Sequence, residues 1–121
     1  MFNNKNCIPC QGGIPPLNGT DILKYQKLIS KEWSIFDEKK LVREFQFKSY
    51  KDAIAFVNQV ADLAEQQGHH PYIHINFKIV IVHLFTHKID GSHENDFLMT
   101  KKIDDLYKFS LASTFGQMFF F

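Results

Sequence analysis

The chain has little cysteine, no long apolar run and no excess of charge of either sign. It carries 14 basic and 13 acidic residues, a formal net charge of +1, so no basic surface for nucleic acid and no acidic tail is indicated. No apolar run approaches the length of a membrane span, and the first residues lack the apolar stretch of a signal peptide. We therefore expect a soluble cytoplasmic protein that contacts neither membrane nor nucleic acid directly.

The two cysteines, Cys7 and Cys10, are spaced as Cys-x-x-Cys, which is half of a zinc site or a redox pair. A second such pair is missing, and the first lies in a segment rich in glycine and proline rather than at a strand-to-helix junction. We therefore interpret both residues as ordinary thiols in an irregular N-terminal arm over residues 1–18.

Periodic apolar residues and cap residues predict one α+β domain over residues 19–109, followed by an apolar tail over 110–121. Asn18 or Thr20, Ser49 and Ser92 are the expected helix caps, and Gly68 is the expected stop of the second helix. The expected elements are a helix with Ile22, Leu23, Tyr25, Leu28 and Ile29 on one stripe, strands over 33–36 and 41–47, a helix over 50–67, strands over 73–77 and 79–86, and a helix over 93–109. The order α-β-β-α-β-β-α implies a four-stranded antiparallel sheet with helices packed on one face.

Alternation within the strands predicts which side chains enter the core. Leu41, Arg43, Phe45 and Phe47 share one side of their strand, and Val80, Val82 and Leu84 share one side of theirs. The opposite face then carries Ile79, Ile81 and Phe85. Because helices cover only one face, these apolar residues on the other face suggest self-association.

All six histidines fall between His69 and His93. Imidazole exchanges protons near neutral pH, so the cluster indicates acid–base chemistry. The Gly68 stop and Pro71 hold His69 and His70 outside regular structure, where adjacent side chains point to opposite sides. That geometry disfavours shared ligation of one metal, although the residues alone leave metal binding open. No partner is aimed at the remaining histidines, so His74 and His93 are expected at the surface and His83 in a subunit contact.

An acidic residue, a His-His-Pro triplet, an aromatic residue, a histidine and an aspartate follow one another at constrained spacings. Here they are Glu65, His69, His70, Pro71, Phe77, His87 and Asp96. The pattern resembles the active-site pattern of the pterin-4a-carbinolamine dehydratase family, and the resemblance extends from the N-terminal leader to about Leu106. One departure is Ile73, where several members of the family carry tryptophan.

The resemblance implies a lyase that dehydrates 4a-hydroxytetrahydrobiopterin to quinonoid dihydrobiopterin by histidine acid–base catalysis, without a metal or an organic cofactor. Such an enzyme recycles the pterin cofactor of aromatic amino acid hydroxylases, which gives a functional link to phenylalanine hydroxylase. The implied catalytic residues are His69, His70 and His87. The implied substrate-binding residues are Glu65, Pro71, Phe77, Thr86, Lys88, Ile89 and Asp96.

The resemblance also implies a homodimer or homotetramer built through the sheet and a helical interface. Two alternatives to the enzyme remain at this level. One is a regulatory, protein-binding module, like the dimerisation cofactor found among the family's animal members. The other is a binder of a different pterin.

Overall fold

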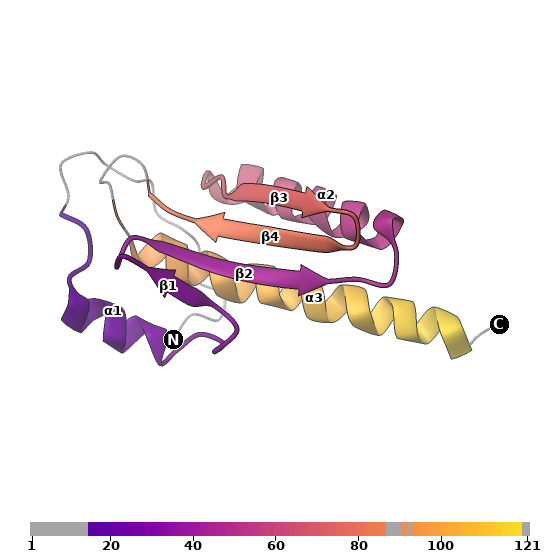
Figure 1. Cartoon of the computed structure of the whole chain (residues 1–121), viewed down its shortest axis with the longest axis horizontal. Coiled ribbons are helices and arrows are strands. Elements are labelled where there is room, and N and C mark those ends of the chain that lie inside the picture. The colour runs from indigo at the N-terminus through magenta and orange to yellow at the C-terminus, as the bar shows by residue number, and fades with distance from the viewer. Residues whose placement is uncertain (1–14, 87–90, 92, 120–121) are drawn as a thin grey trace.

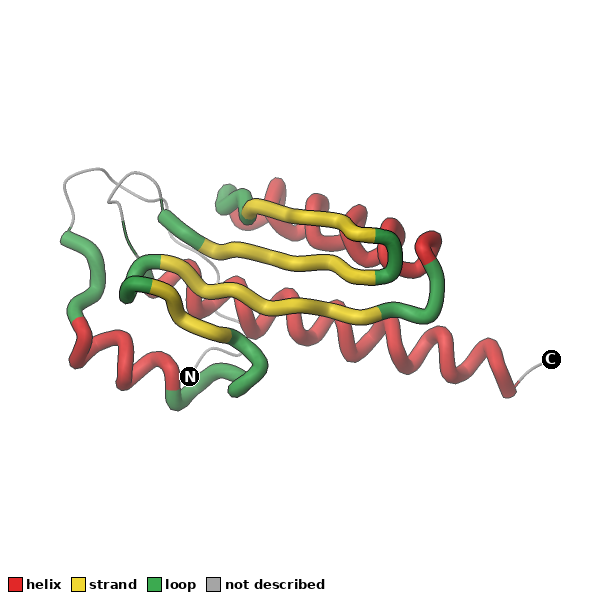
Figure 2. Tube along the Cα trace, viewed as in Figure 1, coloured by secondary structure: helices red, strands yellow, loops and turns green. Residues whose placement is uncertain are grey.

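In the computed structural model of the chain, a four-stranded antiparallel sheet is covered by helices on one face (Figure 1). The structure describes residues 15–86, 91 and 93–119, with side chains through Leu111. Its elements, shown by type in Figure 2, are α1 (Gly19–Gln26), β1 (Ser34–Phe36), β2 (Lys40–Gln46), α2 (Tyr50–Gln67), β3 (Tyr72–Asn76), β4 (Ile79–Leu84) and α3 (Glu94–Phe119). The predicted α+β class and element order are confirmed.

The sheet has the strand order β1-β2-β4-β3, with every neighbouring pair antiparallel. Each predicted strand starts or ends within two residues of the observed one. The β2–β4 register places Leu41 opposite Leu84 and Phe45 opposite Val80, and all four side chains are fully buried. The predicted parity of both strands is therefore correct, and these residues form the floor of the core beneath α2 and α3.

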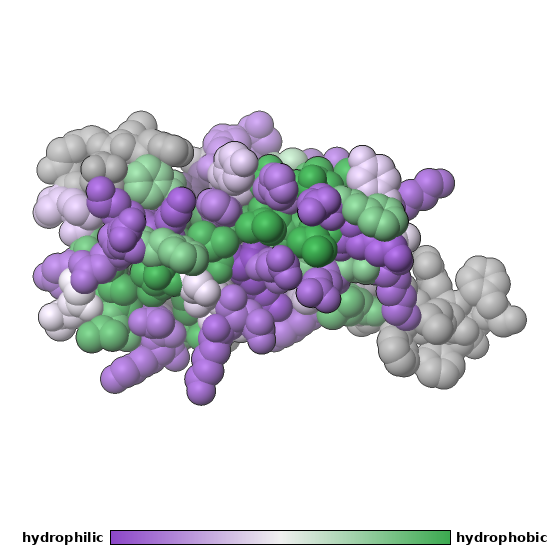
Figure 3. Space-filling view, viewed as in Figure 1, coloured by the Kyte–Doolittle hydropathy of each residue, from purple (hydrophilic) through white to green (hydrophobic). Residues whose placement is uncertain are grey.

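The other face of the sheet carries no helix among the described residues (Figure 1). Ile79 and Ile81 lie on this open face and are half-buried, as their alternation with the fully buried Val80 and Val82 requires. Figure 3 shows apolar side chains gathered over the middle of this face, with hydrophilic side chains around them. Self-association through the face stays a prediction.

The helices differ from their predictions mainly at their ends. α2 spans the predicted residues, and the Ser49 hydroxyl accepts a hydrogen bond from the Asp52 N–H at 3.1 Å. α1 begins at the predicted cap Asn18, but it ends before Leu28, and Leu23 is 61% exposed, so the predicted apolar stripe is only partly correct. No described helix combines the length and apolar character that a membrane crossing requires.

The third helix was expected to end near Phe109 and instead continues to Phe119. No proline interrupts the sequence after Glu94, and the single glycine in this stretch, Gly116, costs a helix only about 1 kcal/mol relative to alanine. The sequence between Phe109 and Phe119 therefore contains no strong helix breaker.

A polar contact ties α3 to the sheet and to the segment before β1. The Asp104 carboxylate accepts hydrogen bonds from Trp33 Nε1 at 2.9 Å and from Arg43 Nη1 at 2.8 Å. The Arg43 guanidinium also lies 4.5 Å from the centre of the Phe45 ring. Burial raises the pKa of the Asp104 carboxyl, while the nearby Arg43 charge and the two hydrogen-bond donors act to lower it.

The Asp104→Asn variant should lower the free energy of unfolding by about 2–4 kcal/mol, because Arg43 would keep a largely buried charge without its counter-ion. The matched control is Asp105→Asn, whose exposed carboxylate contacts Lys101 at 3.6 Å and should change stability by less than about 0.5 kcal/mol. Urea denaturation of both variants measures the difference. Equal losses in the two variants would contradict this role of Asp104.

Candidate active site

The end of α2 fixes where the adjacent histidines begin. Gly68 has a φ of 64°, in the left-handed region that glycine tolerates. Its N–H donates to the Glu65 carbonyl at 3.4 Å, and the His69 N–H donates to the Ala64 carbonyl at 3.1 Å. These two bonds form a Schellman motif, which ends the helix at a defined angle. His69 and His70 therefore stand between α2 and β3, outside regular structure, as predicted.

Asp96, in the first turn of α3, lies at the centre of the buried part of the site and is fully buried. Its Oδ1 is 2.6 Å from His69 Nε2. Its Oδ2 accepts a hydrogen bond from the Thr86 hydroxyl at 2.8 Å and another from the His93 N–H at 2.9 Å. One carboxylate thus joins the end of α2, the end of β4 and the start of α3.

The hydrogen bond to Asp96 sets the tautomer of His69. A carboxylate can only accept hydrogen bonds, so His69 Nε2 must carry the proton that lies between them. When the ring is neutral, its lone pair is then on Nδ1. His69 is only 9% exposed, so the site holds an oriented, largely buried imidazole with one nitrogen committed and the other able to accept a proton.

His70 faces away from this buried pair. Its side chain is 63% exposed, and its Nε2 lies 3.6 Å from Glu65 Oε1, a carboxylate that is itself 81% exposed. Solvent weakens an ion pair of this kind. The adjacent histidines therefore reach different partners, which agrees with the prediction that they point to opposite sides.

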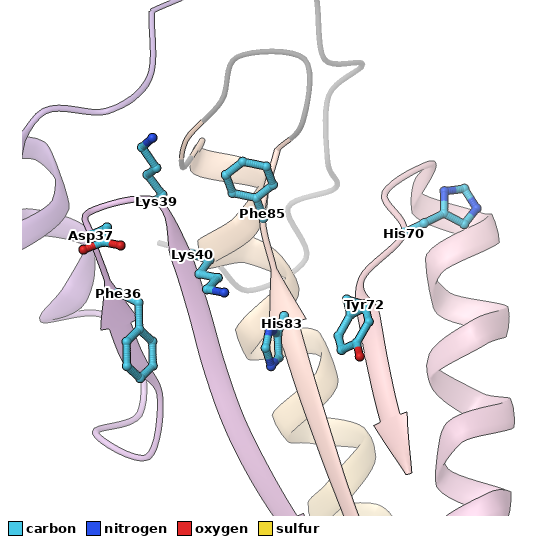
Figure 4. A pocket seen from close by; sticks show the side chains of 8 residues that line it. All are labelled: Phe36, Asp37, Lys39, Lys40, His70, Tyr72, His83 and Phe85. Atoms are coloured by element: carbon cyan, nitrogen blue, oxygen red, sulfur yellow. The ribbon is translucent and has the colours of Figure 1, made fainter.

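His70 borders a concavity of about 540 Å³ on the open face of the sheet (Figure 4). The complete lining consists of Phe36, Asp37, Lys39, Lys40, His70, Tyr72, His83 and Phe85. Side chains from all four strands cross its floor: Phe36 is the register partner of Lys40, and Tyr72 is the partner of His83. Aromatic walls with a few cationic and titratable groups suit a planar, polar ligand.

His83, which was expected in a subunit contact, lies in the wall of this concavity on the open face of the sheet. Partial burial lowers the pKa of its imidazole below 6.5, and the charges of Lys40 and His74 lower that pKa further. The Tyr72 ring lies 5.0 Å from the His83 ring. Near neutral pH, His83 is therefore a neutral side chain that can donate or accept one hydrogen bond per ring nitrogen.

The lowered pKa of His83 gives stability a pH dependence. The unfolded chain binds a proton at this residue more readily than the folded chain. The free energy of unfolding is therefore unaffected by His83 above pH 6.5, and it decreases as the pH falls from 6.5 through the folded pKa.

Lys40→Gln should raise the His83 pKa toward 6.5 in an NMR titration, without restoring it fully because burial remains. Lys39→Gln is the control, since that side chain points away from His83 (Figure 4). An unchanged His83 pKa in Lys40→Gln would refute the assigned cause.

His93 was predicted to be a surface residue, and that prediction is wrong: it is only 9% exposed. Its Nδ1 accepts a hydrogen bond from the Asn95 N–H at 3.0 Å, just before α3 begins at Glu94. The expected cap, Ser92, lies outside the described residues. The sequence contains a signal for this helix cap, because His93 and Asp96 have the spacing of a capping box, with imidazole in place of a hydroxyl.

The structure does not bring every predicted site residue to the cluster. Phe77 was expected to bind substrate, but it occupies the turn after β3 with a φ of 54° and is 63% exposed. The five residues of β3 separate it from the histidine pair, a span of roughly 17 Å at the usual rise per strand residue. Pro71 is half-buried beside His70, and Thr86 is buried against Asp96.

Several predicted residues lie outside the described residues: Cys7, Cys10, His87, Lys88 and Ile89. The chain on either side of the segment 87–90 is held together, since the Thr86 N–H donates to the Gly91 carbonyl at 3.0 Å. His74 is exposed, as predicted. Within the described part of the chain, no group of three or more His, Cys, Asp and Glu side chains is placed to hold a metal ion.

Comparison with known sequences adds an independent finding. A sequence profile of the family described as "Pterin 4 alpha carbinolamine dehydratase" matches residues 15–106. A protein of Alkaliphilus metalliredigens named "Putative pterin-4-alpha-carbinolamine dehydratase" is 43% identical over 100 residues, which cover 83% of this chain and 90% of that protein. A protein of Rubrobacter xylanophilus with the same name is 42% identical, over 84% of this chain and 94% of its own.

Solved structures give the same result. A structure described as a transcriptional coactivator/pterin dehydratase from Brucella melitensis superposes with a TM-score of 0.70 at 28% identity, over 76% of this chain and 98% of that one. A pterin dehydratase-like protein described as a RuBisCO assembly factor of the alpha-carboxysome gives a TM-score of 0.55 at 26% identity, over 63% of this chain and 89% of that one. With the profile covering the domain and relatives above 40% identity over most of both chains, the protein belongs to the pterin-4-alpha-carbinolamine dehydratase family, a family of hydro-lyases.

Proposed function

We propose that the protein dehydrates 4a-hydroxytetrahydrobiopterin to quinonoid dihydrobiopterin through histidine acid–base catalysis. In this reaction an acid protonates the 4a-hydroxyl, the C4a–O bond breaks and water leaves. A base takes the proton from N5, and the electron pair of the N5–H bond forms the N5=C4a double bond. No electron is gained or lost overall, so two groups that exchange protons near neutral pH are enough.

The observation that carries the proposal is the buried pair of His69 and Asp96. A carboxylate that fixes one ring nitrogen leaves the other as an oriented proton acceptor, and it also stabilises the imidazolium that forms when that acceptor is used. The Thr86 hydroxyl and the His93 N–H saturate the second oxygen of Asp96, so the carboxylate cannot turn away from His69.

We assign the acid and base at the C4a–N5 region to His70 and His87, with His69 assisting from the other side of the site. His70 is accessible to solvent and lines the concavity, which is where a diffusing substrate can reach it. His87 follows Thr86 directly in the sequence, and Thr86 is anchored to the carboxylate that holds His69. Because His69 and His70 are adjacent in the sequence, we propose one site that the three imidazoles share.

Substrate binding is assigned to groups around these histidines. Glu65, beside His70, can orient that imidazole or bind the amide-like edge of the pterin ring. Pro71 and the chain from Thr86 through Lys88 and Ile89 would line the pocket. Phe77 is left out, because the structure places it at the far end of β3 and β4.

In the cell, this activity would recycle the pterin cofactor of aromatic amino acid hydroxylases, with phenylalanine hydroxylase as the expected functional partner. A homodimer or homotetramer in the cytoplasm remains our expectation. Other family members are described as a coactivator and as an assembly factor. A folded protein without dehydratase turnover would favour such a protein-binding role, or a different pterin as ligand.

The assay generates the carbinolamine with a hydroxylase and follows the formation of quinonoid dihydropterin by ultraviolet absorbance. His69→Ala, His70→Ala and His87→Ala should each lower kcat by about 10²–10⁴-fold, the usual contribution of a general acid or base. His74→Ala, which removes an exposed imidazole from β3, is the control and should keep the wild-type rate. A wild-type rate in the double variant His70→Ala/His87→Ala would refute the site.

A further inference from the structure

We propose that His93 is a positioning residue of this site: its neutral imidazole caps α3, and the cap holds in place the Asp96 carboxylate that orients His69. His93 has no place in the proposed proton transfers, and it lies one residue before the helix that carries Asp96. A continuous path of hydrogen bonds joins His93 to His69 through residues that are all nearly or fully buried.

The path begins at the cap itself. His93 Nδ1 accepts from the Asn95 N–H at 3.0 Å, and the Asp96 carboxylate accepts from the His93 N–H at 2.9 Å. The side chain before the helix thus satisfies an N–H of the first turn, and the third helical residue satisfies the N–H of the cap. This reciprocal arrangement is a capping box, in which each partner fixes the position of the other.

The path continues from Asp96 to His69. Oδ2 receives the His93 N–H, while Oδ1 is 2.6 Å from His69 Nε2. The carboxylate therefore belongs at the same time to the helix cap and to the hydrogen-bonded pair that it forms with His69. If the first turn of α3 frays, the Asp96 backbone moves with it, and the bond that sets the His69 tautomer changes.

The cap has a chemical requirement that a hydroxyl cap would not have. A backbone N–H is always a donor, so His93 Nδ1 must be unprotonated and the ring proton must sit on Nε2. A protonated His93 would turn an N–H toward the Asn95 N–H, at a helix end that already carries partial positive charge. The cap therefore requires a hydrogen-bond acceptor at the Nδ1 position, and it does not require an imidazole ring.

Two substitutions separate this acceptor from the rest of the side chain. His93→Asn places an amide oxygen near the Nδ1 position, and asparagine is a favoured helix cap. His93→Gln carries its polar atoms one bond further out, near the Nε2 position, and loses the acceptor. Ser49→Ala is the matched control, because it removes the hydroxyl cap of α2 at 3.1 Å, which has no bond to Asp96.

The readouts are the ring-nitrogen NMR signals of His69 in ¹⁵N-histidine-labelled protein, and kcat and KM for dehydration. His93→Asn should retain the wild-type His69 signals and rate. His93→Gln should shift the His69 signals toward a mixture of tautomers and lower kcat about tenfold with little change in KM, the pattern of a misplaced catalytic group. Ser49→Ala should lower Tm and leave His69 and kcat as in the wild type.

Wild-type His69 signals in His93→Gln would overturn the proposal, and so would equal shifts in Ser49→Ala. If His93→Gln does not fold, His93→Asn still decides: a folded His93→Asn with altered His69 signals contradicts the acceptor role, and unchanged signals support it. The kinetic consequence rests on the proposed function, whereas the NMR readout needs no turnover. An inactive wild-type protein would therefore refute the proposed function and leave the positioning role of His93 to be judged by the His69 signals.

Discussion

The site depends on one buried carboxylate that must be fully satisfied. Asp96 is completely removed from solvent, and a buried charge is costly unless hydrogen bonds replace the lost water. Its partners are His69, Thr86 and the His93 N–H, which come from three separate parts of the chain. Satisfying Asp96 therefore requires the end of α2, the end of β4 and the start of α3 to meet, and their meeting builds the buried half of the site.

The two faces of the sheet give the histidines different environments. On the helix-covered side, His69 is shielded and held in one orientation. On the open side, His70 and His83 line a concavity with aromatic walls, which a planar substrate can enter. The Schellman motif at Gly68 makes the division possible, because it turns two adjacent histidines toward opposite sides immediately after a rigid helix. Acid–base chemistry gains from this arrangement, since one imidazole can be insulated while its neighbour stays accessible.

Much of the fold could be predicted from the sequence, because its signals are local. The Ser49 cap, the Gly68 stop and the alternation of Val80, Val82 and Leu84 each act over a few residues, and each prediction is confirmed. The resemblance to the family selected His69 and Asp96, and the structure brings them into contact. The extent of α3 was underestimated, although the sequence contains no strong helix breaker after Phe109.

The features of the site that the sequence did not reveal depend on tertiary context. The burial of His93 depends on Asp96 and Asn95 accepting and donating across the start of a helix, a reciprocal pattern that a single histidine in a polar segment does not reveal. Phe77 matched the spacing of a motif, but spacing along a hairpin does not show which end of the strands a side chain occupies. His83 was expected in a subunit contact, and the concavity that it lines could not be predicted because its other walls come from strands distant in the sequence.

The central claim is that Asp96 holds His69 with its proton on Nε2 and its lone pair on Nδ1. Two-dimensional ¹H–¹⁵N NMR of histidine-labelled protein at slightly alkaline pH reads the tautomer directly. We predict a single Nε2–H tautomer for His69 in the wild type, and loss of that preference in Asp96→Asn. A wild-type His69 that is protonated on Nδ1, or that averages between the two tautomers, would contradict this reading of the site.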